Sequence, residues 1–142
     1  MSLLDYGGLA DAIRNIDQHL ADTRTLDQVL AILRGYRYPT NTEAALQLAV
    51  ERVLTDAGIR FARELVIDPT NRLDFYLPDL RIALELKIAG SVADVTRQLF
   101  RYAKDERVAV IVLMTNRYTH CEVPNVMREK PIEVITLWGG AL

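Results

Sequence analysis

Apolar residues in the first 58 positions recur three and four apart, which is the spacing of helices. The spacing predicts one helix over residues 9–20. Thr25-x-x-Gln28 has the pattern of a capping box, in which two side chains bind free backbone amides, and it predicts the start of a second helix. Thr40-x-x-Glu43 has the same pattern and predicts the start of a longer third helix.

After residue 58 the pattern changes to short runs with the two-residue alternation of strands, separated by turn residues. The predicted strands cover residues 59–67, 72–77, 81–88, 108–114 and 132–138. Ser91-x-x-Asp94 begins a predicted helix between the third and fourth strands. The fourth strand is almost entirely apolar, as in strands that are buried on both faces. These elements predict a three-layer α/β or α+β domain with a central mixed β-sheet and the early helices on one face.

The composition is that of an ordinary globular domain, with 142 residues of which 50% are hydrophobic and 25% charged. We expect residues 1–38 to form an N-terminal helical extension and residues 39–142 to form the core. No apolar run approaches the about 20 residues that cross a membrane, and residues 1–5 lack the basic start of a secretory signal. The single cysteine, Cys121, excludes an internal disulfide. We therefore expect a cytoplasmic protein.

The charge of the chain bears on its partners. A net charge of −2 argues against a protein that coats nucleic acid by bulk electrostatics, although it leaves room for a local basic groove. All but three of the 17 basic residues are arginine. The planar guanidinium group suits bidentate contacts with phosphate, so this composition favours phosphate as a ligand.

The predicted strand over residues 81–88 brings charged residues together. Its even positions are all apolar, so Glu85 and Lys87 share the opposite face, about 7 Å apart. In the preceding strand, Asp74 alternates with apolar neighbours. The residues expected on its apolar face are Leu73, Phe75 and Leu77. The turn between the strands predicts a hairpin in which Asp74 lies directly opposite Glu85 with a four-residue loop, or diagonal to it with a two-residue loop.

Two neighbouring carboxylates repel each other unless a cation or a proton lies between them. Their oxygens suit Mg²⁺ or Mn²⁺ better than zinc. Lys87 would neutralise developing charge and orient a water molecule, so the three groups together fit phosphodiester hydrolysis. The alternative is a solvated strand face with a Glu85–Lys87 pair, because this triplet is common by chance.

The next helix adds a further pattern. Gln98 and Tyr102 lie on one helical stripe, with Arg101 nearby. The ordered motifs are then Asp74, Glu85-x-Lys87 and Gln98-x-x-x-Tyr102. In this order and spacing they resemble the PD-(D/E)XK nuclease superfamily, in its RecB-like branch. The resemblance spans about residues 40–115 and includes the order helix, three strands, helix, strand.

The resemblance implies a metal-dependent deoxyribonuclease with a restriction-endonuclease-like three-layer α/β core. Asp74 and Glu85 would bind Mg²⁺ or Mn²⁺, together with the backbone carbonyl of Leu86. Lys87 would position or activate the attacking water. The sequence departs from the superfamily at Leu73, where the name of the superfamily places proline.

The resemblance also implies DNA as the partner. Gln98 and Tyr102 match residues that contact DNA near the scissile phosphate, and we expect Arg101 beside them to bind DNA as well. Other functions stay open, namely a dimeric structure-specific endonuclease such as a Holliday-junction resolvase, or a non-catalytic DNA-binding or assembly protein of the same fold. The intact Asp74, Glu85 and Lys87 argue against the last, because burying charges without a use costs a few kcal/mol. A homo-oligomer is possible in each case.

The superfamily often supplies one more acid from the helix before the first strand. Glu43 and Glu51 are the candidates, and Glu43 is the one we expect to join the catalytic residues. The competing role of Glu43 is to close the capping box with Thr40. The competing role of Glu51 is to pair with Arg52 or Arg63. The neighbours His120 and Cys121 lack a second ligand pair, so we expect no metal site there.

Overall fold

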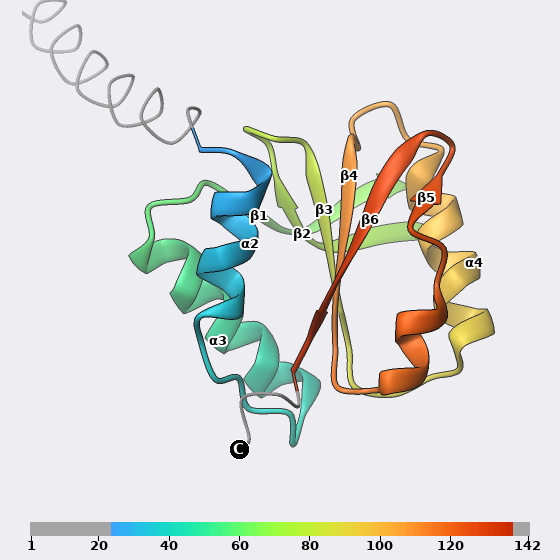
Figure 1. The fold of residues 1–142 in the computed structure, drawn as a ribbon. Helices are drawn as coiled ribbons and strands as arrows, with labels where there is room; N and C mark the ends of the chain where they lie inside the picture. The colour runs from blue at the N-terminus through green and yellow to red at the C-terminus, as the bar shows by residue number, and fades with distance from the viewer. Residues whose placement is uncertain (1–23, 138–142) are drawn as a thin grey trace, which may run out of the picture.

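The computed structural model describes residues 24–137, and the helix predicted over residues 9–20 lies outside them. The described part is an α/β structure with a six-stranded mixed sheet and three α-helices (Figure 1). The helices are α2 (Leu26–Arg34), α3 (Glu43–Asp56) and α4 (Val92–Ala103), with a 3-10 helix η1 over Tyr118–Glu122. The strands are β1 (Ala62–Asp68), β2 (Asn71–Leu77), β3 (Ile82–Lys87), β4 (Val110–Thr115), β5 (Val126–Met127) and β6 (Lys130–Thr136).

The sheet has the order β1-β2-β3-β4-β6-β5. Strands β1, β2 and β3 form an antiparallel meander, whereas β4 is parallel to both β3 and β6. A parallel neighbour requires a crossover connection, and α4 provides it between β3 and β4. The sequence predicted all of these strands except the two-residue β5. None of the helices between residues 24 and 137 has the length and apolarity needed to cross a membrane.

The helix starts follow the predicted caps in two of three cases. The box at the start of α2 is confirmed, because Thr25 Oγ1 accepts from Gln28 N at 3.2 Å and Gln28 Oε1 accepts from Thr25 N at 2.8 Å. Ser91 likewise caps α4, where its Oγ accepts from Asp94 N at 3.1 Å. Each of these bonds satisfies an amide that has no partner within the helix.

The predicted capping box of α3 is wrong. The cap is Thr42, whose Oγ1 accepts from Ala45 N at 3.1 Å. Thr40 and Thr42 are both suitable caps by residue type, and the chain stays extended through Thr42 before it turns helical. Glu43 is therefore the first helical residue and is too early in the helix to close a box.

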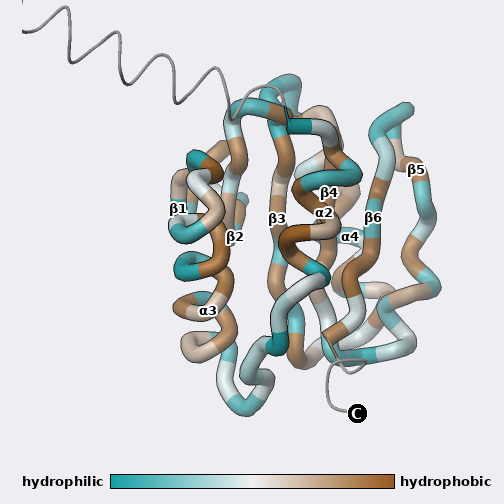
Figure 2. Tube along the Cα trace, turned by 60° about the vertical axis from the view of Figure 1, so that its left-hand side comes forward, coloured by the Kyte–Doolittle hydropathy of each residue, from teal (hydrophilic) through white to brown (hydrophobic). Residues whose placement is uncertain are grey.

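Two apolar layers hold the sheet between the helices. Helices α2 and α3 cover one face and α4 covers the other (Figure 1). The middle strands are mostly apolar along their length (Figure 2). The fully buried leucines that α2 and α3 contribute are Leu33, Leu46 and Leu54. Because Leu33 belongs to the same core as α3 and β3, residues 26–34 of the predicted N-terminal extension pack as part of the core.

Strand β2 does not keep one apolar face, contrary to the alternation that the sequence predicted. Phe75 and Leu77 pack toward α2 and α3, whereas Leu73 packs beneath α4. The change of face occurs at Asp74. In the ladder with β1, the residue across from Asp74 is Glu64, whose φ of 52° lies in the left-handed region and interrupts the regular pleat.

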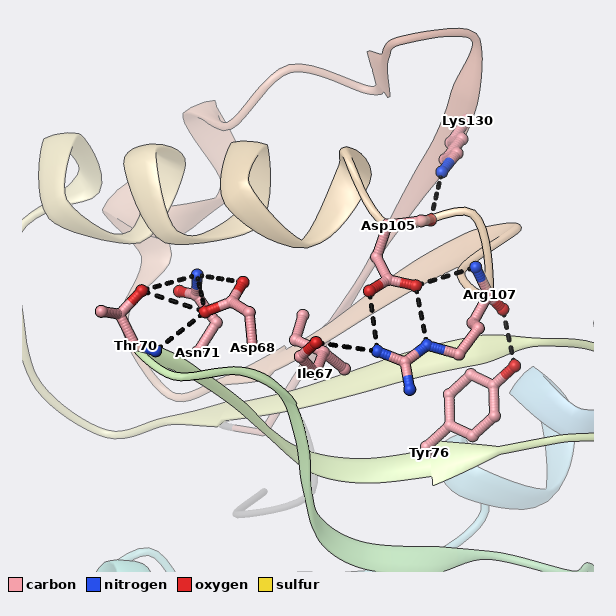
Figure 3. Close-up of polar contacts among 8 residues, drawn as sticks. All are labelled: Ile67, Asp68, Thr70, Asn71, Tyr76, Asp105, Arg107 and Lys130. Atoms are coloured by element: carbon pink, nitrogen blue, oxygen red, sulfur yellow. Dashed lines mark hydrogen bonds and ion pairs between the residues drawn. The ribbon is translucent and has the colours of Figure 1, made fainter.

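The connection between α4 and β4 holds the β1–β2 hairpin against the rest of the sheet (Figure 3). Arg107 donates to the carbonyl of Ile67 at 3.0 Å and to both carboxylate oxygens of Asp105. The hydroxyl of Tyr76 donates to the carbonyl of Arg107 at 2.6 Å, and Lys130 Nζ donates to the carbonyl of Asp105 at 2.7 Å. The hydrogen bonds from Arg107 lower the pKa of Asp105 below its usual range. This network joins β1, β2 and β6 to one loop.

The Tyr76 hydroxyl provides a test of this network. Tyr76→Phe should lower the free energy of unfolding by about 1 kcal/mol, because it removes one hydrogen bond and leaves the ring in place. The melting temperature should fall by roughly 4 °C for a domain of this size. Thermal unfolding followed by circular dichroism measures the change. Tyr118→Phe is the control, since Tyr118 is exposed, and equal melting temperatures for the two variants would contradict the role of Tyr76.

Candidate active site

The pairing of β2 with β3 brings together Asp74 and Glu85, the two acidic residues that the sequence predicted as metal ligands. The strands pair in the register Phe75↔Leu84, Tyr76↔Ala83 and Leu77↔Ile82. This register corresponds to the four-residue loop. Extending it by one residue on each strand brings Asp74 opposite Glu85. The backbone amide of Leu86 donates to Asp74 Oδ2 at 2.8 Å. The hydrogen bond draws the Asp74 carboxylate toward β3, beside Glu85.

Glu85 is buried beneath α4, with 2% of its surface exposed. Its Oε2 accepts a hydrogen bond from the Tyr102 hydroxyl at 3.0 Å. Burial raises the pKa of Glu85 well above its usual range, and the neighbouring Asp74 raises it further, while Lys87 and Tyr102 act in the opposite direction. In the absence of a cation, the acid pair therefore retains a proton to higher pH than an exposed glutamate does. The alternative of a solvated strand face is wrong for Glu85.

The Gln-x-x-x-Tyr pair forms a hydrogen-bonded chain that ends at Glu85. Gln98 Nε2 donates to the Tyr102 hydroxyl oxygen at 2.7 Å, and the carbonyl of Arg72 lies 3.1 Å from the same oxygen. Tyr102 is 1% exposed, and its burial and the charge of Glu85 raise its pKa above the usual range. The structure thus places Tyr102 as a support for Glu85. Contact of Gln98 and Tyr102 with DNA stays a prediction.

A groove lies between α4 and the loop that follows β3. Its volume is about 290 Å³. The side chains that line it include Lys87, Gln98 and Arg101, three of the residues that the sequence predicted for the site, together with Arg97. Arg101 Nε donates to Asn71 Oδ1 at 2.8 Å, which holds the helix against the β1–β2 turn. Asp94 also lines the groove and pairs with Arg97, so Lys87 and Arg101 are the cationic side chains that the groove offers to an anionic substrate.

The predicted third acid is not part of this cluster. Glu43 is exposed in the first turn of α3, on the helix layer opposite α4. Glu51 Oε2 lies 3.2 Å from a guanidinium nitrogen of Arg63, which confirms its competing role as a partner of Arg63. Arg63 also stacks over the Phe75 ring, 5.4 Å from its centroid. Within residues 24–137, no three His, Cys, Asp or Glu side chains gather closely enough to hold a metal ion.

The donors at the acid pair nevertheless suit a hard cation. Mg²⁺ commonly binds through one or two carboxylates and completes its shell with water and substrate oxygens. Asp74 and Glu85 supply two carboxylates from neighbouring strands, and the charge of Asp74, which contributes after burial to the raised pKa of Glu85, would be offset by a cation between them. We therefore find that the residues present fit Mg²⁺ or Mn²⁺. The predicted third ligand, the carbonyl of Leu86, stays a prediction.

The structure gives His120 a role that the sequence did not predict. His120 is fully buried, and its Nε2 lies 2.8 Å from the carbonyl of Gly90 while its Nδ1 lies 2.7 Å from Thr115 Oγ1. Because a carbonyl only accepts, Nε2 carries the proton and Nδ1 accepts from the threonine hydroxyl. Thr115 Oγ1 in turn accepts from Arg117 N at 3.0 Å. His120 therefore connects the end of β4 to the loop that carries the groove.

The chain was compared with descriptions of protein families, with curated proteins and with solved structures, and none of the three comparisons gave a match. The interpretation of this site therefore depends on its own geometry.

The acid pair predicts a pH dependence of stability. The raised pKa of Glu85 means that the folded protein binds more protons than the unfolded chain at pH values above the usual range of glutamate. The metal-free protein should therefore lose stability as pH rises from about 4.3 through the raised value. Glu85→Gln should remove this loss and raise the melting temperature near pH 7 by several degrees, because a neutral amide replaces the acid.

Thermal unfolding between about pH 4 and pH 8 in the presence of a chelator measures the effect. Glu43→Gln is the matched control, because Glu43 is exposed on the other side of the sheet. The same pH profile for wild type and Glu85→Gln would contradict the predicted pH dependence.

His120 predicts a second stability effect. His120→Phe keeps a ring of similar size but leaves the Gly90 carbonyl and the Thr115 hydroxyl without their partner. Each buried group that loses its partner costs about 1–3 kcal/mol, so the free energy of unfolding should fall by roughly 2–6 kcal/mol for the two groups. Urea unfolding measures it, with the exposed neighbour Cys121→Ser as control. A loss below about 0.5 kcal/mol would show that the loop does not depend on His120.

Proposed function

We propose that this protein is a metal-dependent deoxyribonuclease of the PD-(D/E)XK superfamily, in its RecB-like branch, and that it hydrolyses phosphodiester bonds in DNA. One observation carries the proposal. Asp74 on β2 interacts directly with Glu85 on the neighbouring strand β3, and the Gln98–Tyr102 pair is hydrogen-bonded to Glu85. The three motifs, which are separate in the sequence, therefore belong to one cluster of contacting side chains. This is expected if they serve one function.

The fold is compatible with this proposal. The order of α3, three antiparallel strands, α4 and a parallel strand is the order expected of a restriction-endonuclease-like core. The helices α3 and α4 lie on opposite faces of the sheet, as a three-layer arrangement requires (Figure 1).

Asp74, Glu85 and the Leu86 carbonyl would hold the Mg²⁺ or Mn²⁺ ion. When bound, the ion would polarise a phosphate oxygen and lower the pKa of a water molecule. The protein contributes the positions of the ligands. The amide of Leu86 orients Asp74, and the hydroxyl of Tyr102 orients Glu85.

Lys87 and the arginines of α4 act on the substrate. Lys87 lines the groove two residues after Glu85, where its ammonium group can bind a phosphate oxygen and orient the attacking water. Arg101 is held by Asn71 at the same groove and can bind a neighbouring phosphate of the DNA backbone. Each cation stabilises negative charge that grows as the phosphodiester bond is attacked.

The decisive experiment measures cleavage of labelled linear duplex, circular plasmid, single-stranded DNA and four-way junctions with Mg²⁺ or Mn²⁺. Wild type should cleave at least one of these substrates, and Asp74→Asn and Glu85→Gln should each reduce the rate by 100-fold or more, on the order of 3 kcal/mol of lost transition-state stabilisation. Glu51→Gln is the matched control, because Glu51 pairs with Arg63 on another part of the surface. Near-wild-type rates in either acid variant would refute the proposal.

Lys87 separates catalysis from metal binding. Lys87→Ala should lose most of the cleavage rate while Mn²⁺ still binds, because the ammonium group acts on water and phosphate and not on the ion. Calorimetric titration with Mn²⁺ and single-turnover cleavage measure the two properties. Loss of Mn²⁺ binding together with cleavage would assign Lys87 to the structure of the metal site instead.

A further inference from the structure

A second groove lies on the other flank of α4. It runs between this helix and the segment that joins η1 to β5, and its volume is about 430 Å³. The residues that line it are Thr96, Arg97, Phe100, Arg101, Pro124 and Met127. This lining combines apolar surface with two guanidinium groups and contains no acid.

Phe100 is the unusual residue of this groove. It is 43% exposed, whereas the other large apolar residues of α4 are packed against the sheet. Lys104 Nζ lies 4.9 Å from the centroid of its ring. The groove therefore presents a partly exposed aromatic ring with one lysine over it and two arginines in the same lining, and aromatic rings with nearby cations are a combination that binds an unpaired nucleobase and its phosphates.

The two grooves of α4 are connected. Arg97 and Arg101 line both the groove that contains Lys87 and the groove that contains Phe100. They form a ridge between the grooves, about one helix diameter or 10 Å wide, in which Arg97 is ion-paired with Asp94 and Arg101 is hydrogen-bonded to the neutral side chain of Asn71. A polynucleotide backbone that crosses this ridge would place a phosphate near the guanidinium groups and a base on the far side.

We propose that the Phe100 groove binds an unpaired nucleotide of a DNA strand whose neighbouring phosphodiester lies at the Lys87 groove. The inference rests on the proposed nuclease function and adds that the substrate is single-stranded at this position. An aromatic side chain stacks on a base only when the base is unpaired, because duplex DNA presents its phosphates and groove edges instead. The two arginines favour a polyanion over a hydrophobic protein partner in this groove.

Binding of a fluorescein-labelled oligothymidine to the full-length chain, measured by fluorescence anisotropy with a chelator to prevent cleavage, tests the inference. Phe100→Leu should weaken binding by roughly 5-fold to 30-fold, the loss expected for one stacked base, while duplex binding changes less than about twofold. Phe100→Tyr should restore binding because it restores the ring. Tyr36→Leu is the control for an exposed aromatic residue in the helix layer on the opposite side of the sheet.

Arg97→Gln should lower oligothymidine affinity and reduce the slope of log affinity against log salt concentration by about 0.7, as for one lost phosphate contact on a single strand. Circular dichroism shows whether each variant is folded. The inference is overturned if wild type does not bind oligothymidine, or if Phe100→Leu binds as wild type does. It is also overturned if Phe100→Leu weakens duplex binding equally, or if wild type dimerises through this groove and the variant is monomeric.

These outcomes are distinguishable from failure of the nuclease proposal. A chain that cleaves DNA but binds oligothymidine independently of Phe100 keeps the nuclease proposal and overturns this inference. A chain that binds oligothymidine through Phe100 but cleaves nothing with Mg²⁺ or Mn²⁺ retains the nucleotide site and overturns the nuclease proposal.

Discussion

The hydrogen bond from the backbone amide of Leu86 to Asp74 is the constraint on which the candidate site depends. It brings a carboxylate from β2 to the strand that carries Glu85, in the interior of the sheet where like charges repel most strongly. Tyr102 then holds Glu85 in place, so the two acidic groups stay close together and the pair retains a proton to higher pH than an exposed glutamate does. The fold thus maintains an arrangement that is unfavourable by itself, as is common at functional sites.

The sequence predicted the parts of this arrangement that depend on periodicity. The alternation in residues 81–88 placed Glu85 opposite the apolar residues, and the spacing of Gln98 and Tyr102 placed both on one helical stripe. Periodicity does not specify how completely a helix covers each face of the sheet. The burial of Glu85 and Tyr102 therefore could not be predicted, because it results from the packing of α4 against the sheet. Glu43 illustrates the same limit, because its position depends on which of two threonines caps α3.

Features that arise from contacts between distant segments had no local signal. Leu73 changes face because β1 has a left-handed residue across from Asp74, and strand alternation within β2 gives no hint of it. His120 contacts Gly90, which is 30 residues earlier, through a bond between a side chain and a carbonyl. An isolated histidine beside a cysteine is typical of no particular structure. Such contacts depend on tertiary packing, which single-sequence patterns do not encode.

The buried His120 also limits where the chain can be cut or extended. Loops on a protein surface usually tolerate insertions and new termini. The interval from Thr115 to His120 is an exception, since its length brings the imidazole back to the β4 strand end from which the loop departs. A circular permutant opened within this interval would separate the two hydrogen-bond partners. One opened at the exposed Pro124–Asn125 connection would leave them on the same continuous segment.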